Sequence, residues 1–176
     1  MKKFKLDEKN LLSNQDWNFP TTTYYGPGRF NEIGKFCKVS DIKNPLIVTD
    51  SGSKDLPFIK RLIQLLFENN IKSEIFYDIS PNPRDEEISK GCDQFRNGNH
   101  DSIIAIGGGS AMDGGKSICL TVNSDTPLWD FEFEQPAPKI TKKNAFPKII
   151  TIPTTAGTGS ETGRAGVFTN EVTKVK

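Results

Sequence analysis

The residues that are best suited, by type and by spacing, to binding a ligand form the glycine segment Gly107–Gly109. This segment follows the short apolar run Ile103–Ile106. The run is β-branched and lacks polar alternation, which is typical of a parallel strand covered on both faces. Glycines have no Cβ, so the backbone can turn sharply and a bulky anion can approach it. Ser110 and Asp113 are predicted to cap a following helix, whose free N–H groups would favour phosphate. The alternative is a tight turn that holds no ligand.

Two familiar phosphate-binding motifs do not fit the spacing of this segment. A Walker A loop ends in Gly-Lys-Ser/Thr, which Gly115-Lys116-Ser117 matches, but Ser110 stands where its leading glycine belongs. The dinucleotide fingerprint G-x-G-x-x-G fails because Met112 occupies its third glycine position. A degenerate P-loop that serves phosphoryl transfer stays an alternative.

A second segment, Thr154–Glu161, is rich in small and hydroxyl-bearing residues and follows the apolar run Lys148–Pro153. Its hydroxyl and N–H groups would form another cradle of hydrogen-bond donors. Alone, such a loop would be an ordinary turn. Both loops are predicted to begin at the carboxyl ends of buried strands, where open α/β sheets bind ligands. The sequence therefore predicts a nucleotide crevice between them.

Three motifs together resemble the iron-containing (group III) alcohol dehydrogenases, whose relatives include glycerol dehydrogenases and dehydroquinate synthases. They are Gly-Gly-Gly-Ser-x-x-Asp-x-x-Lys over 107–116, Pro-Thr-Thr-Ala-Gly-Thr-Gly-Ser-Glu over 153–161 and Pro-Thr-x-x-x-x-Gly-x-Gly-Arg over 20–29. The resemblance covers about Trp17 to Lys176 and only the first of the two domains of such enzymes. It implies a Rossmann-like parallel sheet with helices on both faces, as in the N-terminal domain of dehydroquinate synthase, with the helical C-terminal domain absent.

The resemblance also implies an activity, the transfer of hydride between the nicotinamide of NAD(P) and an alcohol or aldehyde. In that family Fe²⁺ or Zn²⁺ polarises the substrate oxygen and is held by an aspartate and histidines of the C-terminal domain. This chain has a single histidine, His100, and no His-x-x-x-His pair, so we expect the isolated chain to be inactive. A non-catalytic nucleotide-binding module is the alternative.

Carried over residue by residue, the resemblance and the strand ends indicate a cofactor site without catalytic or metal-binding residues. Asp50 ends its strand where a carboxylate can accept the ribose hydroxyls, which favours NAD and leaves NADP possible; the alternative is a turn or cap residue. Asp113 and Lys116 lie one helical turn apart and can also simply pair on the helix surface. The predicted cofactor contacts are Asp50, Gly107, Gly108, Gly109, Ser110, Asp113, Thr154, Thr155, Thr158 and Lys176.

Alternating apolar segments are expected to position these residues. Strands are predicted at 46–50, 71–78, 103–106 and 148–153, and an extended entry strand at 17–28. Helices are predicted at about 29–39, over 59–67 with Ile59, Leu62, Ile63, Leu66 and Phe67 inward, around Ile88, Cys92 and Phe95, and after the glycines. Such alternation is typical of βαβ units and a parallel sheet. We expect one NAD(P)-binding domain over 1–176, with a loose arm over 1–16.

Composition limits the partners and the location. The 176-residue chain has a formal net charge of +1 and presents no basic field for nucleic acid. No apolar run approaches the ~20 residues that cross a bilayer, and the charged N-terminus is no signal peptide. Cys37, Cys92 and Cys119 lack disulfide or zinc spacing. We therefore expect a cytoplasmic protein, and a homo-oligomer because a lone first domain would expose an apolar face.

Two segments are expected to play no direct part in the site. His100 follows Asn97-Gly98-Asn99 and is predicted to be an exposed turn residue. The proline-rich stretch 126–147 is predicted to be a surface excursion packed by its own aromatic residues, with a dimer contact or a flap near the cofactor as alternatives.

Overall fold

The computed structural model describes residues 21–132, 136, 138–139 and 145–173. Its centre is a four-stranded sheet in the order β2-β1-β3-β4, in which every neighbouring pair is parallel. The strands are the apolar runs of the sequence: β1 (Pro45–Asp50), β2 (Glu74–Ile79), β3 (Ser102–Gly107) and β4 (Lys148–Pro153). The predicted arm 1–16, the start of the predicted entry strand and Lys176 lie outside the described residues.

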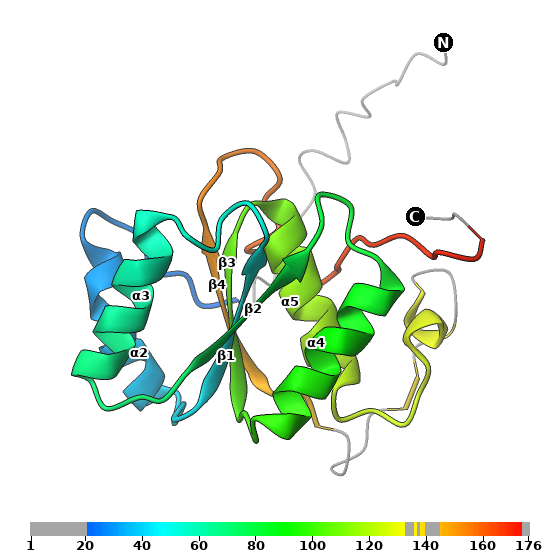
Figure 1. Ribbon diagram of the computed structural model, residues 1–176, viewed down its shortest axis with the longest axis horizontal. Coiled ribbons are helices and arrows are strands. Elements are labelled where there is room, and N and C mark those ends of the chain that lie inside the picture. The colour runs from blue at the N-terminus through cyan, green and yellow to red at the C-terminus, as the bar shows by residue number, and fades with distance from the viewer. Residues whose placement is uncertain (1–20, 133–135, 137, 140–144, 174–176) are drawn as a thin grey trace, which may run out of the picture.

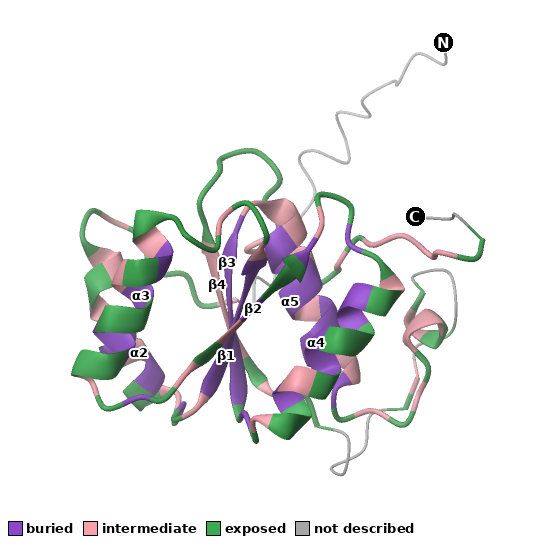
Figure 2. Cartoon of the chain, in the orientation of Figure 1, coloured by how far each residue is buried: buried purple, intermediate pink, exposed green. Residues whose placement is uncertain are grey.

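Helices cover both faces of this sheet (Figure 1). On one side, α2 (Ile33–Val39) and α3 (Pro57–Glu68) pack on alternate strand residues such as Ile47. On the other, α4 (Asp85–Asn97) and α5 (Gly109–Thr121) pack on the intervening residues such as Val48. The central strands β1 and β3 are therefore buried on both faces (Figure 2). The predicted Rossmann-like α/β fold with helices on both faces is confirmed.

The entry segment differs from the prediction. Residues 21–25 form no strand, and the helix predicted over 29–39 begins as a 3-10 turn, η1 (Arg29–Glu32), before α2. Tyr24 instead stacks on Phe36 with 4.1 Å between ring centroids, and the Arg29 guanidinium lies over both rings. Ring packing and a cation–π contact hold this segment, so its β-forming residues do not pair with the sheet.

The inner face of α3 is rotated from the predicted one. Ile59, Leu62 and Leu66 are buried as expected, and Leu65 joins them. The side chains of Ile63 and Phe67, which were predicted to face inward, are 40% and 81% exposed. Both apolar stripes of this helix satisfy a three-and-four spacing, so the pattern alone does not decide which one packs on the sheet.

Strand β4 is only half-buried, whereas the sequence predicted a covered strand. It pairs with β3 alone because the strand order puts it at one edge of the described sheet. The stretch after α5 begins with η2 (Leu128–Phe131), where Leu128 packs on the core and Trp129 rests on Phe168 at 4.8 Å between centroids. The Trp129 ring therefore packs on a later segment of the chain, whereas the sequence predicted that the aromatic residues of this stretch pack on one another. Phe133 lies outside the described residues.

The connections place a switch point between β1 and β3. From β1 the chain crosses to β2 on one side, and β3 then adds to the other side of β1. Helices leave the carboxyl ends of these two central strands towards opposite faces, which opens the position where such sheets bind ligands. Within the described part of the chain, none of the helices is both long and apolar enough to cross a membrane.

Candidate cofactor site

The glycine segment runs from the end of β3 directly into α5. Gly107 has φ +147°, and a Cβ there would lie 2.7 Å from Cβ of Ala111 and 3.2 Å from Oδ2 of Asp50. Gly108 is the N-cap residue, and no side chain caps the helix. The first-turn N–H groups of α5 are therefore left for an external acceptor, and no Cβ of the cap residue stands in front of them.

The predicted cap at Ser110 is wrong. Ser110 lies inside the first turn of α5, because Gly108 takes the N-cap position. Its hydroxyl donates instead to the carbonyl of Pro81 at 2.6 Å, which ties the helix start to the segment after β2. The absence of a side-chain cap strengthens the case for an anion at this helix end, since the charge of the helix dipole is not offset locally.

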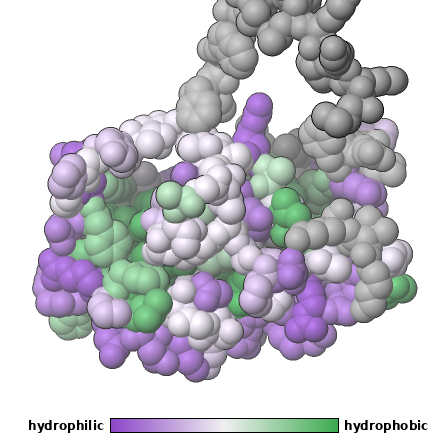
Figure 3. Space-filling model, turned by 90° about the horizontal axis from the view of Figure 1, so that it is seen from above, coloured by the Kyte–Doolittle hydropathy of each residue, from purple (hydrophilic) through white to green (hydrophobic). Residues whose placement is uncertain are grey.

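The second predicted loop lies directly against the first. The Thr154 N–H donates to the carbonyl of Gly107 at 2.9 Å. A Cβ on Gly108 would lie 3.6 Å from Oγ1 of Thr155, and a Cβ on Gly109 would lie 2.9 Å from Cγ2 of Thr158. The close approach of the two loops therefore depends on glycine at 109. Seen from above, the middle of this end carries residues of near-neutral hydropathy, while strongly hydrophilic residues lie mostly at its rim (Figure 3).

Asp50 ends β1 beside the glycine segment. Its Oδ2 accepts a hydrogen bond from the Ser53 hydroxyl at 2.7 Å and faces Gly107. The preceding residue, Thr49, is fully buried, and its Oγ1 has no hydrogen-bond partner within the described residues. A buried hydroxyl without a partner costs free energy, so it marks a place where a ligand acceptor or donor would be favourable. Sequence reasoning missed Thr49, and its only signal was its place at a strand end.

Asp113 and Lys116 do pair, at 3.0 Å, but not on an open helix surface, because their side chains are only 15% and 11% exposed. Asp113 Oδ1 accepts from the Ser160 hydroxyl at 2.6 Å. Lys116 Nζ donates to the carbonyls of Ser160 at 3.0 Å, Gly163 at 3.4 Å and Ala165. Both side chains thus hold the far end of the second loop. These contacts of Lys116 and Ser160 were not predicted from the sequence.

The described residues contain no group of three or more His, Cys, Asp or Glu side chains that could hold a metal ion. Cys37, Cys92 and Cys119 are free and buried. Burial raises the pKa of the Cys119 thiol to about 12, and burial together with the Asp101 charge raises that of Cys37 to about 11. Such thiols stay protonated at neutral pH and are poor metal ligands. This donor set does not fit Fe²⁺ or Zn²⁺.

His100 is buried, which corrects the prediction of an exposed turn residue. Its Nδ1 lies 3.0 Å from the carbonyl of Asn44, which can only accept, so Nδ1 carries the proton. Its Nε2 lies 3.7 Å from a carboxylate oxygen of Glu74 and has no hydrogen-bond partner within the described residues. The imidazole thus links the amino ends of β1, β2 and β3, opposite to the glycine segment.

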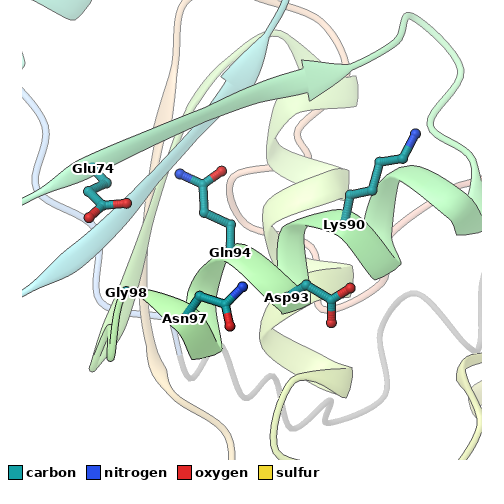
Figure 4. Close-up of a pocket in the computed structure, with 6 residues that line it drawn as sticks. All are labelled: Glu74, Lys90, Asp93, Gln94, Asn97 and Gly98. Atoms are coloured by element: carbon teal, nitrogen blue, oxygen red, sulfur yellow. The ribbon is translucent and has the colours of Figure 1, made fainter.

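A concavity of about 510 Å³ lies beside His100 at this amino end of the sheet. Glu74 of β2 and Gln94 of α4 project towards it from facing elements, whereas Asn97 points towards Asp93 and Lys90 extends away (Figure 4). The lining is polar and charged, and it lies at the strand ends where open parallel sheets do not bind nucleotides. The glycine segment, not this concavity, is therefore the candidate cofactor site.

Comparison with known proteins shows which proteins the chain resembles. The chain is 34% identical over 163 residues to a 1,3-propanediol dehydrogenase of Citrobacter freundii, across 92% of this chain and 41% of that protein. It is 37% identical over 165 residues to an NADH-dependent butanol dehydrogenase A of Clostridium acetobutylicum, across 92% of this chain and 40% of that protein. The chain thus spans less than half the length of these relatives.

Solved structures of similar proteins resemble this chain as well. A 1,3-propanediol oxidoreductase matches with a TM-score of 0.81 and 32% identity, over 91% of this chain and 41% of that one. A sulfoacetaldehyde reductase from Bifidobacterium kashiwanohense in complex with NAD⁺ matches with a TM-score of 0.80 and 30% identity, over 93% and 42%. The family profile described as iron-containing alcohol dehydrogenase matches residues 20–176. The chain belongs to the iron-containing alcohol dehydrogenase family.

Proposed function

We propose that this chain is the NAD(H)-binding part of an alcohol dehydrogenase, in which hydride passes between the nicotinamide and a small alcohol or aldehyde. The observation that carries the proposal is the contact between the loops that follow β3 and β4, at the carboxyl end of the sheet and beside its switch point. The glycine segment meets the threonine loop at 2.9 Å between the Thr154 N–H and the Gly107 carbonyl. The NAD⁺ complex of the sulfoacetaldehyde reductase and the NADH dependence of the butanol dehydrogenase support the choice of cofactor.

In this proposal the residues have separate tasks. The backbone of Gly107–Gly109 and Ser110 holds the diphosphate at the N-terminus of α5, because its N–H groups are uncapped. Thr154, Thr155 and Thr158 line the cofactor from the second loop. The remaining predicted contact, Lys176, lies outside the described residues and stays a prediction.

Asp50 and Asp113 have different tasks in the proposal. The Asp50 carboxylate accepts the ribose hydroxyls and disfavours a 2′-phosphate by charge repulsion, which favours NAD over NADP. Asp113 was predicted to contact the cofactor. Its Oδ1 already accepts from Ser160 and pairs with Lys116, so its proposed task is to position the second loop.

The nicotinamide of the bound dinucleotide supplies or accepts the hydride, and the described residues hold and orient the dinucleotide through its diphosphate and ribose. They do not fit a metal, so no step is assigned to Fe²⁺ or Zn²⁺ in this part of the protein. Substrate oxidation or reduction is proposed for the whole protein, since the chain spans 41% of the first relative.

The test is a fluorescence titration of the 176-residue chain with NADH, NADPH and Mg-ATP. We expect NADH to bind, NADPH to bind more weakly and Mg-ATP not to compete. Gly109→Val should weaken NADH binding tenfold or more, because its side chain would displace Thr158, which already lies 2.9 Å from a Cβ at this position. Gly163→Ala is the matched control, since its Cβ would meet nothing closer than 3.9 Å. A folded chain that ignores NADH, or that binds Mg-ATP instead, would overturn the proposal.

We further propose that copies of the chain associate in the cytoplasm. Large apolar side chains, such as Phe67 at 81% and Tyr25 at 95% exposure, support association. Three buried free thiols support a reducing compartment. Light scattering coupled to size exclusion tests the association. A monomer at all concentrations, with Phe67→Ser behaving identically, would count against it.

A further inference from the structure

We propose that Lys116 and Asp113 are positioning residues that latch the second loop onto α5 and thereby set the affinity for the dinucleotide. This inference rests on the proposed function in one respect, namely that the ligand is a nicotinamide dinucleotide. The latch itself is a feature of the protein that can be tested without any cofactor.

The Lys116 ammonium has no capacity left for a phosphate. An ammonium has three N–H donors. Lys116 faces four oxygen partners, namely the carbonyls of Ser160, Gly163 and Ala165 and the carboxylate of Asp113. Although a lysine near a glycine loop suggests a phosphate contact, this lysine acts through the loop and not on the ligand.

Asp113 completes the latch from the same helix face, one turn before Lys116. Its Oδ1 accepts from the Ser160 hydroxyl at 2.6 Å and lies 3.0 Å from the ammonium. Because both side chains are mostly buried, solvent screens the pair less than it screens a surface ion pair. The latch therefore combines charge-assisted hydrogen bonds to side chain and backbone at a single point of the loop.

The loop is anchored at its two ends and free in between. Its start is held by the Thr154 N–H on Gly107, and its end by the latch at 160–165 and by the Thr151 hydroxyl, which donates to the Glu161 carbonyl at 3.0 Å. Between these anchors, Gly157 and Gly159 adopt φ values of +145° and +65°, and a Cβ on either would meet nothing within 4 Å. The exposed middle thus has little packing of its own to keep it against the glycine segment.

The chain after the latch is also pressed onto α5. A Cβ on Gly166 would lie 2.7 Å from Oγ of Ser117 and 2.9 Å from the carbonyl of Asp113. Loss of the ammonium would leave several carbonyls without a donor at this contact, which favours local opening of the loop. Thr155 and Thr158 would then leave Gly108 and Gly109, and the dinucleotide would lose one wall of its site.

The experiment compares Lys116→Met with the control Lys90→Met. Lys90 is an exposed lysine of α4 whose ion pair within the described residues is with a surface glutamate, Glu86, at 2.7 Å. Trypsin cleavage after Arg164, an exposed residue inside the latched segment, is followed by mass spectrometry of the fragment that ends there. We expect cleavage to rise about tenfold in Lys116→Met and to stay at the wild-type rate in the control, because cleavage follows the open population.

NADH titration of the same proteins supplies the second readout. We expect the Kd for NADH to rise about tenfold in Lys116→Met, and saturating NADH to restore slow cleavage, since ligand binding and loop closure are reciprocally linked. Global unfolding would also raise cleavage after Arg61 in α3, whereas local opening of the loop would raise cleavage after Arg164 alone. Ser160→Ala, which removes only the hydroxyl on Asp113, should show a smaller effect of the same kind and covers the case in which Lys116→Met does not fold.

The outcomes separate the latch from the proposed function. Unchanged cleavage in both variants would overturn the latch. Increased cleavage with unchanged NADH affinity would overturn its link to the cofactor. Wild-type chain that does not bind NADH would instead overturn the proposed function, while the cleavage comparison would still decide whether the latch exists.

Discussion

The two ends of the sheet close their turns by different means. At the amino end, α2, α3 and α4 each finish with a non-glycine residue in the left-handed region, namely Asp41, Asn70 and Asn99. At the carboxyl end, positive φ values belong to glycines such as Gly107 at +147° and Gly157 at +145°. Asp and Asn tolerate the left-handed region, but residues with a Cβ rarely adopt the φ values of these two glycines. Backbone that only glycine can adopt is therefore concentrated at the proposed binding end.

The three amino-end turns share one hydrogen-bond pattern. The residue after the left-handed one donates to a carbonyl five positions back in each case, at 2.8 Å for Ile42, 3.0 Å for Ile71 and 3.0 Å for His100. This is the Schellman ending of a helix, in which that last residue packs back on the helix. His100 thus occupies the same position in its turn as Ile42 and Ile71 occupy in theirs. Both isoleucines are buried, which explains the burial of His100.

Backbone polar groups at the amino end are paired within the protein, although His100 Nε2 has no hydrogen-bond partner in the described part of the chain. Asp101 accepts from the backbone N–H groups of Lys43 at 2.8 Å and Asn44 at 3.1 Å, and the Asn44 amide donates to the carbonyls of Gly98 and Asn99. At the carboxyl end, the α5 N-terminus has no side-chain cap and Thr49 no partner within the described residues. The hydrogen bonds at the amino end therefore stabilise the fold, whereas the carboxyl end leaves polar groups available to a ligand.

The largest expected effect follows from Gly107→Ala. The new Cβ would lie 2.7 Å from that of Ala111 and would hold a φ of +147°, so both overpacking and backbone strain oppose folding. We expect the free energy of unfolding to fall by about 2–4 kcal/mol in urea denaturation. Asn99→Ala, at the amino end, should cost about 1 kcal/mol, since only an ordinary left-handed position is lost. Equal losses at the two ends would remove the contrast.

A second prediction concerns His100, which occupies a turn position that is isoleucine in the other two amino-end turns. His100→Ile should be more stable than His100→Ala by about 2 kcal/mol, because isoleucine fills the buried space that alanine leaves empty, while both variants remove the unpartnered Nε2. Both variants should bind NADH like the wild-type chain, since the imidazole lies at the opposite end of the sheet. Thermal unfolding and NADH titration provide the two measurements, and a strong loss of NADH affinity in His100→Ile would contradict the separation of the ends.

The converse prediction concerns Asp50 at the carboxyl end. Asp50→Ala should weaken NADH binding about tenfold and narrow the preference over NADPH, because the ribose hydroxyls lose their acceptor. The free energy of unfolding should change by less than about 1 kcal/mol, since the lost contact is one half-buried hydrogen bond with Ser53. Ser53→Ala is the matched control, because it removes the same hydrogen bond but keeps the carboxylate. Equal NADH affinities in all three proteins would exclude a role for Asp50.

Much of this contrast was predictable from local pattern. Apolar runs that end in Asp50 and Gly107 indicated parallel strands, and the rule for open sheets then placed both residues at one edge, where they lie in contact. The meeting of the glycine and threonine loops followed from the same rule. The fold and the location of the candidate site were therefore within reach of the sequence.

Other features depend on tertiary packing that no local pattern encodes. Lys116 and Ala165 are 49 positions apart, so their contact requires the folded sheet. The burial of His100 depends on how Asn99 closes α4, and the exposure of Phe67 depends on which of two apolar stripes of α3 meets the sheet. The edge position of β4 depends on strand order, which the spacing of strands along the chain does not specify.

The smallest expected effect is a pH dependence that originates near the amino end. Cys119 donates to the carbonyl of Pro147, just before β4, and Cys37 lies in the first Schellman turn. Burial raises the pKa of the Cys119 thiol from 9.0 to about 12 and that of Cys37, together with the Asp101 charge, to about 11. Below pH 9 the thiols are protonated in both the folded and the unfolded chain, so their stabilising contribution is fully present there.

Above pH 9 the unfolded chain releases these protons first, and the folded state loses stability by roughly 1 kcal/mol per pH unit and thiol until the folded pKa is reached. Urea unfolding of wild type and Cys119→Ala at pH 8 and pH 10 measures the effect, and the variant should show the shallower decline because other groups titrate equally in both. NADH affinity of the folded chain should not follow this decline, since the thiols lie away from the binding end. Parallel slopes in the two proteins would show that the Cys119 thiol ionises as readily in the folded chain as in the unfolded one.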